Sequence, residues 1–299
     1  MRLPVDLGAD AQARKAQPVT LDPAQTASQA WVVVATECIE HWRTNEALVL
    51  GSRAMPHLHQ TRVGIRRLRS SFSLFRPLLG HVPGAFLVAH RLRALALPFG
   101  AARDLDVLIT GPLVEDLDDD QVARLASDRE AAYDAVVAIL VSPQWADAAR
   151  SLDGYLLLAP WPGVADPPVL ELAAHALQKR WQRVVGRVDS LAAMTPPERH
   201  RVRIEAKKLR YGCEFFASLY PDAGLEVVTG SGEELTGALA FAWHVEQVQT
   251  ALGAVNDQAA ADELLRSVGS AAPGVDEHRL VERAADAVRS LAQVPRFWH

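Results

Sequence analysis

The chain has 299 residues, of which 49% are hydrophobic and 22% charged, and its formal net charge is −5. This length and apolar content can supply one large or two modest hydrophobic cores, and they exclude a mostly disordered chain. The two cysteines, Cys38 and Cys213, exclude a framework of several disulfides, so we expect buried free thiols in a reducing cytoplasm.

Helical patterns predominate along the whole chain, whereas alternating β-branched residues are scarce. Several expected helices begin with a capping residue followed by proline, as at Ser142-Pro143, at Thr195-Pro196 with Glu198, at Asp22-Pro23 and at Asp166-Pro167. We predict an all-α fold with helices over residues 23–50, 56–79, 84–98, 103–111, 118–141, 143–158, 167–192, 196–220, 233–252, 255–268 and 277–293.

Proline and glycine also suggest how the helices are grouped. A proline-rich segment over 159–168 is the expected hinge between two halves, 23–160 and 167–293. A glycine-rich stretch over 228–237 is expected to form a loop, and residues 1–22 a mobile tail. The tail has no continuous apolar run and other apolar runs are too short to span a bilayer, so we expect a cytoplasmic protein without a membrane partner.

Charge is segregated along the chain. Between Ala47 and Arg103 there is no acidic residue, yet nine arginines and four histidines fall in this window. Seven acidic residues follow between positions 104 and 120. A basic surface can therefore coexist with an acidic total charge, and a polyanionic partner is compatible with the net charge.

The basic window contains a motif that recurs in the second half. The spacing of one histidine, one arginine and a four-residue basic cluster is identical in the two copies, which are 141 residues apart: His59, Arg62, Arg66, Arg67, Leu68 and Arg69 match His200, Arg203, Lys207, Lys208, Leu209 and Arg210. Residues 102–106 and 255–258 are also related, at an offset larger by about a dozen residues. This repetition predicts two equivalent helical halves, each with one cationic helix.

Helical periodicity divides each cationic helix into two faces. In the first copy, the cations His59, Arg62, Arg66 and Arg69 share one quadrant, Arg67 flanks it, and the opposite side is apolar: Leu58, Ile65, Leu68, Phe72 and Phe75. In the second copy, His200, Arg203, Lys207 and Arg210 lie opposite Val202, Leu209 and Phe216.

A run of like charges on one helix face is unfavourable by itself. Each like-charged pair at a spacing of four residues costs about 0.2–0.5 kcal/mol, whereas alternating Glu and Lys would recover a similar amount. A run of this kind is often a solvated surface. Its repetition at fixed spacing instead favours two helices that form a cradle for a polyanion.

The histidines allow two interpretations. Both fall in the first two turns of their helices, where the helix dipole favours anions and opposes an imidazolium, and a histidine there is commonly structural. We hypothesise that His59 and His200 gain a proton when an anionic ligand binds. Neither HxxxH on one helix nor HExxH is present, so we expect no metal site and no cofactor.

Three aspartates stand near the predicted helix starts that follow the basic motifs. Asp104, Asp106 and Asp257 could cap those helices, or they could pair with an arginine of the basic helix and hold it in position.

Together, HQTRVGIRRLRSSFSLF with AARDLDVL and HRVRIEAKKLRYGCEFF with ALGAVND resemble the paired signatures of the CHAD family, the conserved histidine α-helical domain. The resemblance covers residues 23–293. It implies two pseudo-symmetric halves that resemble four-helix bundles, a central basic pocket that binds inorganic polyphosphate, and targeting to polyphosphate granules.

The resemblance also assigns residues to the pocket. One side would be formed by His59, Arg62, Arg66, Arg67 and Arg69, and the other by His200, Arg203, Lys207, Lys208 and Arg210. Secondary contacts would come from Arg93, Arg103, Lys179, Arg183, Tyr211, Asp104, Asn256 and Asp257. Some relatives carry a triphosphate tunnel domain rich in Glu-x-Glu-x-Lys; this sequence does not contain that element, so no hydrolase activity is inferred from it.

Two other functions stay open. A nucleic-acid module could use the same phosphate contacts, but the aromatic residues that stack on single-stranded bases are not interleaved with the cations. A phosphoanhydride-processing enzyme would need carboxylates to hold Mg²⁺, and no P-loop or acidic cluster lies within the basic helices. We therefore expect a binding protein for polyphosphate or another phosphate or sulfate polyanion.

Overall fold

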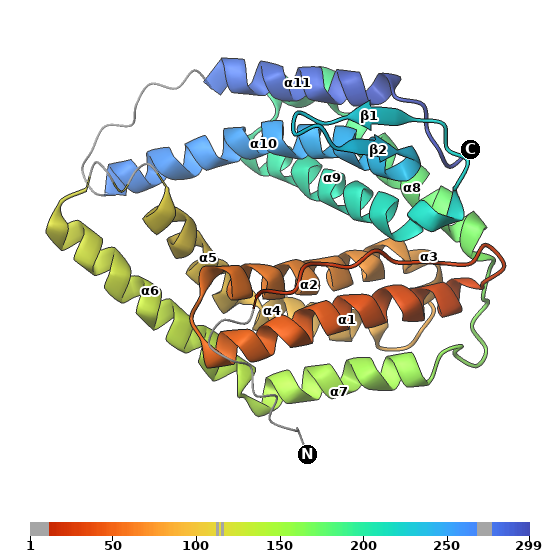
Figure 1. The fold of residues 1–299 in the computed structure, drawn as a ribbon, viewed down its shortest axis with the longest axis horizontal. Helices are drawn as coiled ribbons and strands as arrows, with labels where there is room; N and C mark the ends of the chain where they lie inside the picture. The colour runs from red at the N-terminus through yellow and green to blue at the C-terminus, as the bar shows by residue number, and fades with distance from the viewer. Residues whose placement is uncertain (1–11, 112–113, 115–116, 268–276) are drawn as a thin grey trace. The chain divides into compact units, whose positions relative to one another are not determined.

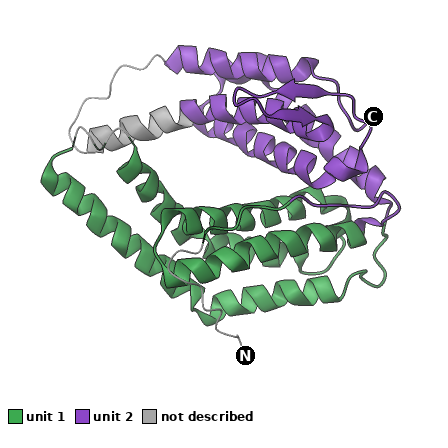
Figure 2. Ribbon diagram, in the orientation of Figure 1, with its two compact units in different colours: residues 1–17, 28–166 green, residues 18–27, 167–299 purple. Residues whose placement is uncertain are grey.

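The computed structural model describes residues 12–111, 114, 117–267 and 277–299, with side chains omitted over 256–267. Its secondary structure is helical apart from one short hairpin, which confirms the predicted all-α class (Figure 1). The chain divides into two compact units, shown in Figure 2: residues 1–17 with 28–166, and residues 18–27 with 167–299. The division after residue 166 falls inside the segment expected to be a hinge.

Unit 1 consists of the helices α1 to α7. Their bounds are α1 (Ala27–Gly51), α2 (Met55–Leu74), α3 (Arg76–Leu79), α4 (Ala85–Leu95), α5 (Leu97–Thr110), α6 (Asp119–Leu140) and α7 (Pro143–Leu157). Helix α2 contacts α3, α4 and α5, while α6 packs on α5 and α7 on α4. Helix α2 therefore lies at the centre of this unit.

Aromatic side chains fill the core of unit 1. The rings of Trp42 and Trp145 meet edge to face at 5.1 Å, and Phe99 stacks on Trp145 at 5.4 Å. Burial of such large rings contributes most of the hydrophobic stabilisation of a small unit. Close approach of α1 and α2 depends on Gly64, because a Cβ there would stand 2.8 Å from the backbone nitrogen of Trp42.

Unit 2 is built around α9 and α10. Its elements are α8 (Val169–Val185), the 3₁₀ helix η2 (Val188–Ala193), α9 (Pro196–Phe216), the 3₁₀ helix η3 (Ala217–Leu219), β1 (Glu226–Val228), β2 (Glu234–Thr236), α10 (Gly237–Ser267) and α11 (Glu277–Gln293). Helix α9 packs between α8 and α10, and α11 covers α10 and η2. Phe215, Phe216 and Phe241 are fully buried in this unit.

Several predicted boundaries differ from the structure. The helix expected over 56–79 breaks at Phe75, because Pro77 lacks the N–H that a continuous helix would use. The two helices expected over 233–252 and 255–268 are one helix, α10. Part of the loop expected over 228–237 forms the antiparallel β1–β2 hairpin, in which Val227 pairs with Leu235.

Cap predictions are confirmed at two helices. The hydroxyl of Ser142 accepts from the backbone N–H of Trp145, and Thr195 forms a reciprocal capping box with Glu198. At Asp166 the prediction is wrong: α8 begins at Val169, and the Asp166 carboxylate accepts from the backbone N–H of Ser28 at the start of α1. Helix α1 begins at Ala27, after a turn at Asp22.

The N-terminal segment is anchored from Arg14 onward, so the prediction of a mobile tail over 1–22 is wrong for that part. The backbone N–H of Arg14 donates to Asn45, and that of Gln17 donates to Glu37. The following residues belong to unit 2, where the N–H of Leu21 donates to Ser218. Residues 1–11 lie outside the described residues.

Both cysteines are buried free thiols, as predicted. Among the described residues, no single helix is long and apolar enough to cross a membrane, and only the bent pair α4–α5 meets the length and composition criteria when the two helices are taken together.

Candidate functional site

The first cationic face lies on α2 of unit 1. His59, Arg62, Arg66 and Arg69 are all partly exposed, at the spacing expected for one side of a helix. The opposite side is buried, with Leu58, Ile65, Leu68, Phe72 and Phe75 all in the core. The predicted amphipathic division of α2 is confirmed, and it directs the cations away from the core.

Helix α9 presents the second cationic face, in unit 2. His200 is exposed, Arg203, Lys207 and Arg210 are partly exposed, and Val202, Leu209 and Phe216 are buried. The capping box at Thr195 fixes the start of this helix and thereby the rotation of its first turns. The pocket expected to be shared by the two faces stays a prediction, as does the internal symmetry.

Both histidines lie in a field of positive charge. Burial, followed by Arg103, Arg66 and Arg62, lowers the pKa of His59. The pKa of His200 is lowered by burial and then by Arg203 and Lys207, which match Arg62 and Arg66 in the repeat. The two units therefore place their histidines in similar surroundings, in which the neutral imidazole is favoured while no anion is bound.

Arg62 contacts the neighbouring helix α5. Its Nη1 donates to the backbone carbonyl of Phe99, and burial lowers its pKa, opposed chiefly by the carboxylate of Asp104. Asp104 lies in the interior of α5, so the capping interpretation is wrong for this residue. The alternative, an aspartate beside an arginine of the basic helix, agrees with this electrostatic contact.

Asp106 lies in the interior of unit 1. Its carboxylate is fully buried and accepts from the Nε of Arg129 at 2.9 Å and from the hydroxyl of Tyr133 at 2.9 Å. Burial and this hydrogen bond raise the pKa of Tyr133. The predicted pairing of Asp106 with an arginine is realised with Arg129 of α6, and its charge also acts on Arg62 of α2, whose pKa it raises against the effect of burial.

Arg67 does not share the partly exposed face. It is only 5% exposed and lies near His41 of α1, whose pKa is lowered by burial and by the charges of Arg67 and Arg14. Successive side chains in an α-helix are 100° apart around its axis, so Arg67 points away from the side that carries Arg66 and toward α1. Its expected place at the edge of the cationic face is corrected accordingly.

Two predicted contacts, Lys208 of α9 and Arg183 of α8, are engaged in ion pairs within unit 2. Lys208 donates to Glu205 of its own helix at 2.7 Å, and the same carboxylate pairs with Arg180 at 2.6 Å and Arg183 at 3.3 Å. Burial alone would raise the pKa of Glu205, but the hydrogen bonds from Lys208 and Arg180 lower it to about 2. Arg180 and Arg183 thus tie α8 to α9 through Glu205.

Arg180 is a charged residue that the sequence patterns missed. It is buried at 4% exposure on the core side of α8, where helical periodicity alone would predict an apolar residue. The acidic residue Glu205, three positions before Lys208 in an otherwise basic helix, is the signal that a buried cation faces it.

Arg210 and Tyr211 form the C-terminal part of the second face. Arg210 pairs with Glu214 at 2.6 Å, and its guanidinium carbon lies 5.0 Å from the centre of the Tyr211 ring. Tyr211 itself is buried. Arg103 lies close enough to His59 to lower its pKa, while Arg93 and Lys179 are exposed. The side chains of Asn256 and Asp257 lie outside the described residues, but α10 is continuous through both positions, so neither residue caps a helix.

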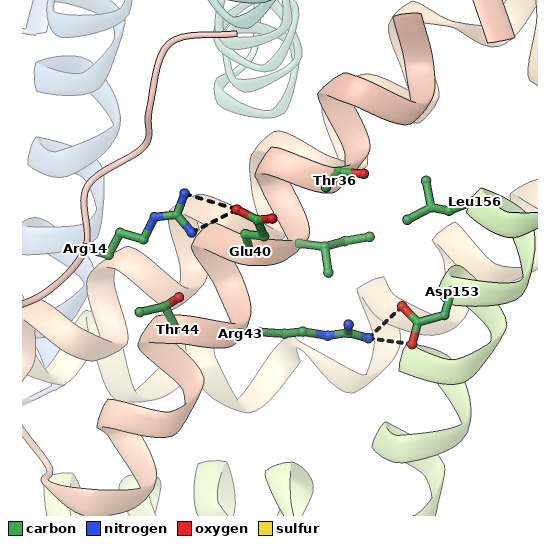
Figure 3. Close-up of a pocket in the computed structure, with 8 residues that line it drawn as sticks. Arg14, Thr36, Glu40, Arg43, Thr44, Asp153 and Leu156 are labelled. Atoms are coloured by element: carbon green, nitrogen blue, oxygen red, sulfur yellow. Dashed lines mark hydrogen bonds and ion pairs between the residues drawn. The ribbon is translucent and has the colours of Figure 1, made fainter. Parts of the chain in front are cut away.

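A surface pocket of about 400 Å³ lies elsewhere in unit 1, beside α1 and α7 (Figure 3). Arg14 pairs there with Glu37 at 2.8 Å and Glu40 at 3.5 Å, and Arg43 with Asp153 at 2.9 Å. Because these carboxylates already compensate both arginines, we do not assign this pocket to a polyanion. Within the described residues, no group of three or more His, Cys, Asp or Glu side chains could hold a metal ion.

Comparisons with known proteins agree with the fold and with the motifs. The family model of the CHAD domain matches residues 33–266. The crystal structure of the CHAD domain from the plant Ricinus communis is similar to this chain, with 26% sequence identity and a TM-score of 0.74 over 97% of this chain and 99% of that one. A comparison with curated protein sequences found no match.

Proposed function

The chain belongs to the CHAD family, and on that premise we propose that it binds inorganic polyphosphate through the cationic faces of α2 and α9. Binding in this proposal involves no chemical turnover, and the protein acts as a polyphosphate-binding module in the cytoplasm that is targeted to polyphosphate granules.

One observation carries the proposal. In each unit a helix presents a histidine near its start and two cations at equivalent positions on the same side, His59 with Arg62 and Arg66 on α2, and His200 with Arg203 and Lys207 on α9. Like charges at this spacing repel one another, and the recurrence of the arrangement in two units supports a ligand rather than a solvated surface.

Polyphosphate suits these faces chemically. A linear chain carries about one negative charge on each internal phosphate, so it can compensate several cations along a helix at once. Arginine offers a planar set of N–H donors that fits phosphate oxygens, and hydrogen bonds between ionised partners are about twice as strong as neutral ones.

The proposal is tested by removing one charge from each face. We expect the double variant Arg66→Ala with Lys207→Ala to weaken binding of long-chain polyphosphate by at least about 10-fold, because each lost charge-assisted hydrogen bond contributes roughly 1.5–3 kcal/mol. Both side chains are partly exposed, so the circular dichroism spectrum is expected to stay helical.

A matched control removes the same number of charges elsewhere. Arg150→Ala with Arg289→Ala changes two exposed arginines on α7 and α11. This variant is expected to bind like the wild type. Equal affinity for the wild type and the Arg66→Ala, Lys207→Ala variant would refute the assignment of the faces.

Two assays distinguish the other functions. Duplex DNA at the same phosphate concentration is expected not to displace polyphosphate, and efficient displacement would favour a nucleic-acid phosphate binder. Release of orthophosphate in the presence of Mg²⁺, abolished by Asp257→Asn, would favour a phosphoanhydride-processing enzyme.

A further inference from the structure

In each unit, one arginine of the cationic helix lies against a glycine of the neighbouring helix. A Cβ atom placed on Gly100 of α5 would stand 3.4 Å from Nη1 of Arg62. A Cβ on Gly253 of α10 would stand 3.1 Å from Nη2 and 3.6 Å from Cζ of Arg203.

The two contacts occur at matching positions of the repeat. Arg62 and Arg203 are separated by 141 residues, like the rest of the basic motif, and Gly100 and Gly253 by 153 residues. The same 153 residues separate Asp104 from Asp257, so the glycines belong to the second repeated element. The arrangement of an arginine on a glycine therefore recurs in two separate units.

Backbone conformation does not explain these glycines. The glycines with positive φ are Gly84, Gly163, Gly232 and Gly237, so Gly100 and Gly253 have ordinary helical backbones. Glycine within a helix costs about 1 kcal/mol relative to alanine. At Gly64 the close packing of Trp42 explains why a glycine is needed despite this cost. Beside Gly100 and Gly253, the corresponding space is occupied by an arginine side chain.

This contact restricts the guanidinium group. In unit 1, Nη1 of Arg62 also donates to the carbonyl of Phe99, the residue before Gly100, so the group is held against the backbone of α5 by a hydrogen bond as well as by contact. An arginine held in this way loses less rotamer freedom when it binds a phosphate, and it keeps further N–H donors for that purpose.

We propose that Gly100 and Gly253 are positioning residues for polyphosphate binding: each provides a side-chain-free site on its helix, the arginine seat, that orients Arg62 or Arg203 toward the phosphate oxygens. The inference rests on the proposed function. It assigns a role in that function to two residues that contribute no side chain of their own.

The test replaces each glycine by alanine. We expect Gly253→Ala to weaken binding of long-chain polyphosphate by about 5–10-fold, because its Cβ would stand 3.1 Å from Nη2, a tighter contact than Cβ atoms normally make, and Arg203 has to move away from it. Gly100→Ala, whose contact of 3.4 Å is close to an ordinary van der Waals distance, is expected to weaken binding by no more than about 2-fold. Gly154→Ala in α7 is the matched control, since nothing lies within 4 Å of its Cβ, and its affinity is expected to be unchanged.

A double-mutant cycle separates positioning from a general effect on the fold. If Gly253 acts through Arg203, the Gly253→Ala change has no further effect on affinity in an Arg203→Ala background. An equal loss in both backgrounds would overturn the proposal, as would wild-type affinity in the Gly253→Ala variant. The NMR signal of the Arg203 Nε–H group supplies an independent readout, and we expect Gly253→Ala to shift it while Gly154→Ala leaves it in place.

The failure of this inference is distinguishable from failure of the proposed function. If the wild-type chain does not bind polyphosphate, the proposed function fails and the inference fails with it. If the wild-type chain binds polyphosphate and both glycine variants bind it with the same affinity as the wild type, only the role of the arginine seat is refuted.

Discussion

His59 and His200 are the residues whose ionisation is expected to respond most directly if an anion binds. Both have a pKa lowered by burial and by neighbouring cations, so the imidazoles are mostly neutral near pH 7 in the free protein. A phosphate placed beside them would favour the imidazolium and raise the pKa of each. Ligand binding and proton uptake are therefore linked.

We predict that polyphosphate affinity rises as the pH falls from 8 to 6. A group whose pKa is higher in the complex than in the free protein binds a proton on complex formation, so lower pH favours the complex within the window between the two pKa values. Calorimetry in two buffers with different ionisation enthalpies is expected to show net proton uptake at pH 7.

A double variant tests the origin of this pH dependence. His59→Gln with His200→Gln is expected to remove most of the proton uptake, whereas His278→Gln, an exposed histidine of α11, is expected to retain it. An unchanged imidazole titration of His59 and His200 in the presence of polyphosphate would contradict the prediction.

Helical periodicity predicted the environment of most residues in the candidate faces. It placed His59, Arg62 and Arg66 on the partly exposed side of α2 and Leu68 in the core, because side-chain direction in a helix follows from the rotation per residue. Arg67 could not be placed in this way. Its burial depends on α1 lying alongside, which is a tertiary fact that local spacing does not contain.

At the scale of elements, two helix boundaries were predicted incorrectly at the glycines that lie against Arg62 and Arg203. The predicted helices over 84–98 and 103–111 leave Gly100 between them, yet α5 starts at Leu97 and continues through Gly100. The break predicted between residues 252 and 255 likewise falls at Gly253, whereas α10 is continuous from Gly237 to Ser267. A helix that tolerates an interior glycine for the sake of a neighbouring side chain looks, in sequence, like two shorter helices.

The contact between α8 and α9 depends on the charge of Glu205, for which the sequence motif predicted no role. Glu205 stands within the basic repeat, but its carboxylate holds Lys208 of its own helix together with Arg180 and Arg183 of α8. The hydrogen bonds that lower its pKa to about 2 show that the ionised form is strongly preferred in the folded chain. Arg180 is itself buried, so its ion pair with Glu205 is expected to matter for the stability of unit 2.

We predict that Glu205→Gln destabilises unit 2 by roughly 2–3 kcal/mol at pH 7, because the variant leaves Arg180 without its carboxylate. The folded-state pKa lies below the usual value of 4.5, so this stabilisation is fully present above pH 4.5 and is lost progressively as the pH falls toward 2. Urea unfolding at pH 7 and pH 3 checks both parts.

The control for Glu205→Gln should change an acidic residue that is also in an ion pair but is exposed. Glu282 of α11 meets this condition through its contact with His278, and Glu282→Gln is expected to change stability by less than about 1 kcal/mol. A stability difference between wild type and Glu205→Gln that stays constant from pH 7 to pH 3 would mean that the ion pairs do not lower the pKa of Glu205 as described.

For the molecule as a whole, the formal net charge of −5 is expected to weaken binding of a polyanion less than the number suggests. At physiological ionic strength the Debye length is about 8 Å, so charges farther from a bound phosphate are largely screened. Asp118, Asp119 and Asp120 lie at the start of α6, while the cations of the two faces lie on α2 and α9. Local charge is therefore expected to govern the proposed interaction.

Binding that depends on local cations has a characteristic salt dependence. A polyanion in water holds condensed counterions, and each cation of the protein that neutralises a phosphate releases about one of them. The logarithm of the association constant therefore falls linearly with the logarithm of the salt concentration, and the slope reports how many cations take part. By analogy with nucleic acids, one contact changes the slope by roughly 0.7–0.9.

We predict that each unit contributes to this slope. Arg66→Gln in α2 and Lys207→Gln in α9 are each expected to reduce its magnitude by roughly 0.7–0.9, and the two changes together by about twice as much. Arg150→Gln on α7 leaves the slope unchanged if exposed arginines outside the faces do not take part. A slope altered by the change in α2 but not by the change in α9 would restrict polyphosphate to unit 1, because counterion release counts only the cations that contact the chain.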